Sequence, residues 1–242
     1  MIKFFRKIRY DLMEKNKTGK YLKYAIGEIL LVVIGIIIAL QLNNWNESRN
    51  QSYKEIISLK ALKSELQNDL NTEFIPGKNN YFRRNKSLSR IIEVYRKKDT
   101  ISKDSLLNCF RRSITEWNFA LNEAAFENLK STGINLITND SLRLKITSMY
   151  STKYPEIMLR NNRLIQFTER EVRPTLNDNV DLYSATLSQN EFDFLKNNKK
   201  ISNRMFELYY LRRWMLEELD IIIPELKSLL RDIDKEIALI EK

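Results

Sequence analysis

The most apolar stretch of the chain lies near its N-terminal end. Residues 29–40 are twelve consecutive residues without a polar side chain, and over residues 24–42 only Glu28 and Gln41 interrupt the apolar character. At about 1.5 Å per residue, a helix over 24–42 is roughly 28 Å long, close to the thickness of a bilayer's hydrocarbon core. Because the apolar positions cover every face, an amphipathic surface helix is disfavoured. The pattern predicts a transmembrane helix, with a buried core helix as the alternative.

Beyond this span, the apolar positions recur with helical periodicity. No Gly or Pro occurs between Gly35 and Pro76, so we expect the membrane helix to continue as a stalk and to end at Pro76-Gly77. The strongest repeat lies near the C-terminus and alternates steps of three and four residues, the pattern of a coiled-coil seam. This bundle seam consists of Leu216, Leu219, Ile223, Leu226, Leu230, Ile233, Ile237 and Ile240. We expect it to pack antiparallel on the stalk of the same chain; an intermolecular coiled coil is the alternative.

The remaining pattern predicts an all-α fold. Only five glycines and four prolines occur in 242 residues, which argues against a many-turned β fold. Polar capping positions and apolar spacing predict helices over residues 79–97, 106–114, 117–130, 139–172, 188–196 and 202 onwards. Gly133 is expected to cap one of them, residues 134–137 to be an extended link, Pro155 to kink or break a helix, and Pro174 to end it.

The charge distribution predicts the orientation in the membrane. Residues 1–23 contain eight Lys or Arg and two acidic residues, and such an excess marks the cytoplasmic side. The residues that follow the span lack the small-residue pair of a cleavage site, so we expect an uncleaved signal anchor. The expected organisation is a cytoplasmic segment (1–23), a transmembrane helix (24–42) and an extracytoplasmic helical bundle (43–242).

One face of the span has a distinct composition. Gly35 and Ala39 form a small-xxx-small pair, which allows a second helix to approach closely and favours a homo-oligomer. A stripe at offsets 0, 3, 7, 11 and 14 contains this pair, and its residues are Glu28, Leu31, Gly35, Ala39 and Leu42. An acidic residue in a span suggests a function, although Glu28 is close enough to the interface to reach it or to pair with Lys23.

Three segments resemble a known family. They are MIKFFRKIR at the N-terminus, GKYLKYAIGEILLVVIGIIIALQLNNWNE across the span, and AFENLKSTGINLITNDSLRLKITSMYSTKY further on. Together they are similar to a family of Bacteroidota membrane proteins that is carried as a domain of unknown function. The resemblance implies a bacterial inner membrane with the large domain in the periplasm. It supplies no catalytic or binding residues.

Composition removes several classes of chemistry. The chain has no histidine, which excludes Ser-His and Cys-His nucleophiles and the commonest zinc ligand. Its single cysteine, Cys109, cannot form an intrachain disulfide, and the isolated glycines form no phosphate loop. No catalytic, metal-binding or cofactor-binding residues are therefore predicted, and no cofactor.

Two further clusters are open to more than one interpretation. The basic run with Arg83, Arg84, Lys86 and Arg90 is expected to be a solvated helix face, with anionic lipid or polysaccharide as alternative partners. Nucleic acid is disfavoured by the expected compartment. An aromatic cluster includes Arg212 and is expected to be core; a cation–π or carbohydrate-stacking site is the alternative. It consists of Phe206, Tyr209, Tyr210 and Trp214, with Arg212 and Arg213.

These observations favour a membrane-anchored interaction or scaffolding protein, oligomeric through its span and in contact with the lipid bilayer. A periplasmic sensor that relays movement to another membrane protein is one alternative. A homo-oligomeric channel with Glu28 at the pore is another. An enzyme that uses only carboxylate, Ser, Tyr or Lys side chains is the least favoured.

Overall fold

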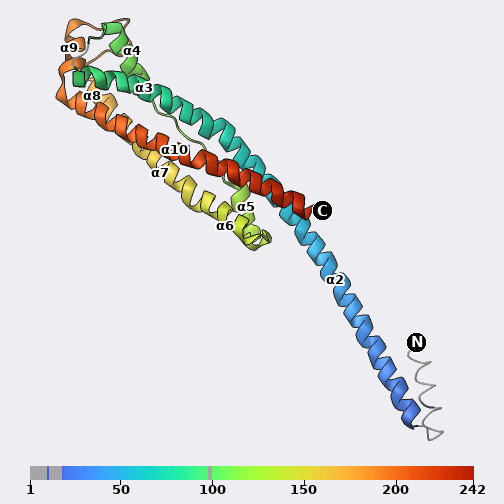
Figure 1. Ribbon diagram of the computed structural model, residues 1–242. Coiled ribbons are helices and arrows are strands. Elements are labelled where there is room, and N and C mark those ends of the chain that lie inside the picture. Colours follow the sequence, from blue (N-terminus) through green and yellow to red (C-terminus); the bar gives the residue numbers. More distant parts are fainter. Residues whose placement is uncertain (1–9, 11–17, 98–99) are drawn as a thin grey trace. The chain divides into compact units, whose positions relative to one another are not determined.

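The computed structural model describes residues 10, 18–97 and 100–242 (Figure 1). Within this part the chain is helical and has no strand, so the predicted all-α class is confirmed. Most of the predicted cytoplasmic segment 1–23 lies outside the described residues. The helices are α2 (Thr18–Asp69), α3 (Ile75–Lys97), α4 (Lys103–Ser113), α5 (Ala124–Thr132), α6 (Asp140–Ser148), α7 (Tyr154–Phe167), α8 (Arg173–Asn177), α9 (Gln189–Asn197) and α10 (Lys199–Ile240).

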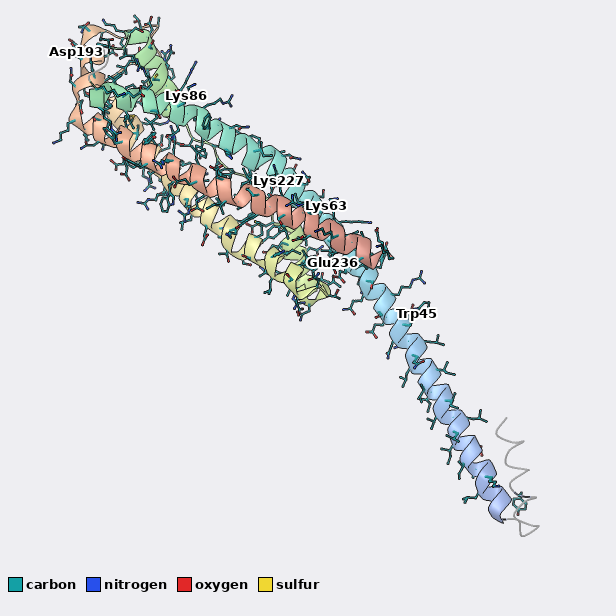
Figure 2. All side chains as sticks on the ribbon, viewed as in Figure 1. Trp45, Lys63, Lys86, Asp193, Lys227 and Glu236 are labelled. Atoms are coloured by element: carbon teal, nitrogen blue, oxygen red, sulfur yellow. The ribbon has the colours of Figure 1, made fainter. Side chains whose placement is uncertain are left out.

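The chain divides into two compact units, Met1–Lys54 and Glu55–Lys242, and each is described by itself. In the first unit, the described residues from Thr18 onward are entirely helical. Every residue from Ile29 to Gln51 is exposed, including the twelve consecutive apolar residues 29–40 of the predicted span. Around Trp45, side chains stand off the helix on all sides (Figure 2). Length and composition make this helix a candidate membrane span.

The second unit is a bundle of three long helical rods. The first rod runs from Glu55 through α3, the second from α6 through α8, and the third is α10. Ion pairs Lys60–Glu241 and Lys63–Asp234 align the first rod antiparallel to α10, and Lys145–Asp232 and Lys153–Glu225 do the same for the second rod. The predicted stalk stripe supplies core residues to the first rod: Leu59, Leu62, Leu66, Leu70 and Phe74 are all buried.

Pro224 lies inside the continuous α-helix α10. The other three prolines also lie inside rods rather than at their ends, which corrects the predicted breaks. Five-residue π-helical turns precede each of them: η1 (Leu70–Phe74) before Pro76, η3 (Met149–Lys153) before Pro155 and η4 (Thr168–Val172) before Pro174. In each case the residue before the proline donates its N–H to the carbonyl five residues back. A proline ring crowds the preceding turn of an α-helix, and the wider π turn gives it room. The helix predicted to end at Pro76-Gly77 therefore continues to Lys97.

A second correction concerns the helix predicted over residues 117–130. Only its last part is helical, as α5, and residues 115–123 are not helical. The topology explains this stretch, because the first two rods point the same way and the chain must return along the bundle between them. An extended chain spans about 3.3 Å per residue, against 1.5 Å in a helix, so few residues cover the distance. We call residues 114–123 the return segment.

Local capping signals largely behave as the sequence predicts. Ser102, Asn139 and Ser188 each accept a backbone N–H at the start of α4, α6 and α9. Gly133 ends α5 with a φ of 112° and donates its N–H to the Leu129 carbonyl. Two expectations are wrong in detail. The extended link at 134–137 begins as a 3-10 turn over Ile134–Leu136, and α10 begins at Lys199 because Asn198 caps it.

Candidate functional site

The predicted stripe of the span lies on α2 in the first unit. Leu31 and Leu42 are 64% and 60% exposed, and Gly35 and Ala39 are also exposed. Glu28 is half-buried. A methyl group added at Gly35 would point into open space, because no side chain and no backbone atom outside the neighbouring helix turns lies within 4 Å of it. The described residues thus leave the small-residue face open to a neighbouring helix.

The bundle seam lies on α10 in the second unit. Leu219, Ile223, Leu226, Leu230, Ile233 and Ile237 are buried, and Leu216 and Ile240 are half-buried against the same core. The burial occurs within one chain, since α10 packs on the other two rods. These residues therefore form core rather than an exposed surface.

An acidic ladder on the first rod holds the return segment and the first turn of α5, and it consists of Glu65, Asp69 and Glu73. The Ala125 N–H donates to Glu65 Oε2 at 2.8 Å, and the Asn122 N–H donates to Asp69 Oδ2 at 3.2 Å. The Ala120 N–H donates to Glu73 Oε2 at 3.2 Å. An extended backbone among helices lacks a strand partner for its N–H groups, and these carboxylates take that role.

Two tyrosines of the second rod also donate hydrogen bonds to carboxylates of the acidic ladder. Tyr150 Oη donates to Glu65 Oε1 at 2.9 Å, and Tyr154 Oη donates to Asp69 Oδ2 at 3.1 Å. Burial raises the pKa of both tyrosines. It also raises the pKa of Asp69 to about 6, although the hydrogen bonds from Asn122 and Tyr154 favour the charged form. Because Asp69 is fully buried, we assign the cluster a structural role.

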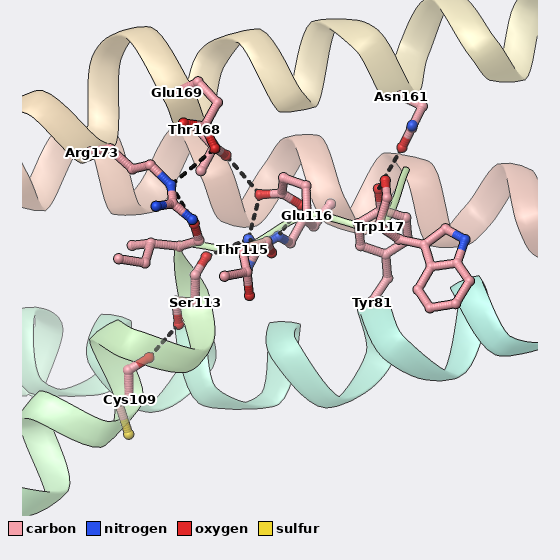
Figure 3. Close-up of polar contacts among 12 residues, drawn as sticks. Tyr81, Cys109, Ser113, Thr115, Glu116, Trp117, Asn161, Thr168, Glu169 and Arg173 are labelled. Atoms are coloured by element: carbon pink, nitrogen blue, oxygen red, sulfur yellow. Dashed lines mark hydrogen bonds and ion pairs between the residues drawn. The ribbon is translucent and has the colours of Figure 1, made fainter. Parts of the chain in front are cut away.

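Further along the return segment, Glu116 forms an ion pair with Arg212 of α10. Figure 3 shows Glu116 together with Thr168, another of its partners. The side chains are 4% and 0% exposed, and Arg212 Nη2 lies 2.5 Å from Glu116 Oε1. Thr168 of the second rod also donates to Glu116 Oε1, at 2.6 Å, and Arg212 donates to the carbonyls of Ser113 and Thr115. One arginine therefore joins α10, the end of α4 and the return segment.

The aromatic cluster expected around Arg212 does not form as one unit. Tyr210 and Trp214 are 52% and 43% exposed, and Trp214 lies 4.1 Å under the guanidinium of Arg160. Arg212 faces the interior instead. Its position continues the seam of α10 towards the N-terminus, where Leu208, Arg212, Met215 and Leu219 follow one another at spacings of four, three and four. The sequence therefore contains one indication of this buried pair, which is that Arg212 occupies a position where the helical spacing of α10 predicts an apolar core residue.

The basic run on α3 lies beside two arginines of α4, Arg111 and Arg112. Together they line a cleft of about 860 Å³, which we call the basic cleft. The solvated face expected here is therefore concave, and the sequence did not indicate that α4 contributes to it. The side chains that line the cleft are Asn80, Arg83, Arg84, Lys86, Ser87, Arg90, Cys109, Arg111, Arg112 and Thr115. Among the described residues, no group of three acidic or cysteine side chains is arranged to hold a metal ion.

A family comparison covers both units. Residues 28–201 match the family described as "Family of unknown function (DUF6090)". The chain belongs to this family. The matched region includes most of the candidate span, the acidic ladder and the basic cleft, and it ends at the start of α10. Comparisons with curated proteins and with solved structures give no match.

Proposed function

We propose that this DUF6090 protein is a membrane-anchored interaction or scaffolding protein that self-associates through its span. The observation that carries the proposal is the open stripe on α2. It combines two small residues, Gly35 and Ala39, with exposed apolar neighbours. In a bilayer, helices associate where small residues allow their backbones to approach closely.

The proposal includes the placement that the sequence suggests. The N-terminus is cytoplasmic and residues 43–242 lie in the periplasm of a bacterium with an inner membrane, as the resemblance to Bacteroidota proteins implies. The basic flank supports this orientation through the positive-inside rule. The proposal assigns the chain no reaction, and the helical bundle presents surfaces to partners.

The test is the mass of the full-length protein extracted in mild detergent. We expect Gly35→Ile to convert a defined oligomer into a monomer, because the larger side chain separates the two backbones. Gly27→Ile is the matched control: it makes the same change on the same helix, about 80° around the axis from Gly35 and about 120° from Ala39, where there is also open space.

The outcomes separate the alternatives. An unchanged oligomer mass in Gly35→Ile, or an equal loss in Gly27→Ile, would contradict association through this stripe. A foreign subunit at fixed stoichiometry in the wild-type complex would favour the relay function instead.

A further inference from the structure

The basic cleft collects positive charge from two helices. Arg83 and Arg90 lie on one face of α3, seven residues apart, Arg84 lies at the edge of that face, and Arg111 and Arg112 come from α4. Lys86 also projects from this part of α3 (Figure 2). In the described part of the chain, the residues that line the cleft include no aspartate or glutamate. Like charges repel one another, so this arrangement favours an anion between them.

Two of these arginines already have partners. Arg111 donates to the carbonyls of Leu182 and Ser184, which fix its position without neutralising its charge. Arg90 pairs with Glu93 at 3.1 Å, and both side chains are more than 40% exposed. The positive charge of the cleft therefore persists, since neutral carbonyls and one solvated ion pair offset little of it.

Arg84 lies deeper than its neighbours. Its Nη1 atom is buried and has no hydrogen-bond acceptor among the described residues. Burial and the nearby Arg212 lower its pKa, although an arginine stays protonated in water. A buried charged donor without an acceptor is unfavourable, and an anion bound in the cleft would offset the charge of this guanidinium.

We propose that the basic cleft binds a phosphate-bearing ligand with more than one negative charge. Guanidinium groups match phosphate oxygens with two parallel hydrogen bonds, and several arginines here could share one ligand. The volume of about 860 Å³ lies within the range of small-molecule sites. No aromatic side chain lines the cleft in the described residues, so base stacking is not provided and the phosphate itself is the recognised group.

Cys109 provides a reporter without engineering, because it lines the cleft and is the single cysteine of the sequence. The experiment compares its reaction rates with an anionic and a cationic methanethiosulfonate reagent, in the full-length protein in a neutral detergent. Charged clefts raise the encounter rate of opposite charges by a factor of about ten or more. Because a thiolate itself attracts cations, the anionic-to-cationic rate ratio of Cys109 is divided by the same ratio for free cysteine, and we expect this normalised ratio to be on the order of ten.

The variant Arg83→Gln/Arg112→Gln should bring this ratio close to one. Both side chains are exposed, so the fold should tolerate the change. Burial raises the pKa of Cys109 and Arg112 opposes that rise, but a change in thiolate fraction on removal of Arg112 affects both reagents equally and leaves their ratio unchanged. The control variant Arg163→Gln/Arg231→Gln removes two exposed arginines elsewhere in the bundle and should keep the wild-type ratio.

Protection identifies the source of the phosphate. Tripolyphosphate should slow the labelling of Cys109 in the wild type and in the control variant, and at least tenfold more should be needed in Arg83→Gln/Arg112→Gln. Protection by cardiolipin in the micelle, whose two phosphates carry two negative charges, without protection by tripolyphosphate, would identify a lipid headgroup as the ligand. A rate ratio equal to that of free cysteine, or the absence of protection by both phosphate sources, would overturn the proposal. A variant made monomeric by a substitution in the span should show the same rate ratio and the same protection as the wild type, so this test is independent of self-association.

Discussion

The buried pair between Glu116 and Arg212 makes a prediction whose sign depends on the background. Breaking a buried ion pair by removing one partner costs about 3–5 kcal/mol, because the other charge is left uncompensated. Arg212→Met has this effect, and it also removes the donor to the Ser113 and Thr115 carbonyls. We expect it to lower the free energy of unfolding by at least about 4 kcal/mol.

Glu116→Gln keeps the shape of the side chain and removes its charge. In the wild-type background it leaves the Arg212 guanidinium buried without its counter-charge, and it should cost about 2–3 kcal/mol because the amide oxygen still accepts hydrogen bonds. In the Arg212→Met background the same substitution removes an unpaired buried carboxylate. There it should raise the free energy of unfolding by about 1 kcal/mol or more.

Equilibrium urea unfolding of the full-length protein in detergent measures these free energies, with tryptophan fluorescence and near-UV circular dichroism as coincident probes. The control cycle uses the exposed pair Lys63–Asp234, whose side chains are 40% and 52% exposed. Lys63→Met and Asp234→Asn should be coupled by less than about 1 kcal/mol. If Glu116→Gln lowers the free energy of unfolding equally in both backgrounds, the charges of Glu116 and Arg212 do not compensate each other and the reasoning is refuted.

Two further predictions concern the core. The pKa of Asp69 rises from 3.8 to about 6 on folding, so the folded state holds this proton more tightly than the unfolded state. This difference contributes about 3 kcal/mol to the free energy of unfolding. The contribution is fully present below about pH 4 and is lost as the pH rises through about 6. Asp69→Asn should remove this decline from the pH profile of urea unfolding, and an unchanged slope would contradict the assignment. A Cβ at Gly77 would lie 2.8 Å from Phe119 Cε1 and 3.0 Å from Trp117 Cδ1. Gly77→Ala should therefore lower the free energy of unfolding by about 1–3 kcal/mol, although alanine has a better helix propensity than glycine. Gly27→Ala, in open space, is the control; a melting temperature for Gly77→Ala at or above that of the wild type would show that the rings move aside freely.

Local and periodic features of this protein follow from its sequence alone. The candidate span is a continuous apolar run, the seam of α10 repeats every seven residues, and the caps at Ser102, Asn139 and Ser188 act within three residues of themselves. Each of these features depends on neighbours along one helix, where sequence spacing fixes the geometry.

Tertiary contacts decide the rest. Trp117 and Phe119 have helix-compatible neighbours, yet the return segment is extended because the acidic ladder takes its N–H groups and the bundle topology needs its length. Arg212 and Glu116 are 96 residues apart, so no local pattern pairs them. The basic cleft exists because the connection after α3 places α4 beside the arginines of α3. At Pro76, Pro155 and Pro174 the packing of the rods selected a π turn over a break, because a continuous rod keeps its apolar stripe in the core, whereas Pro224 lies in α10 without such a turn.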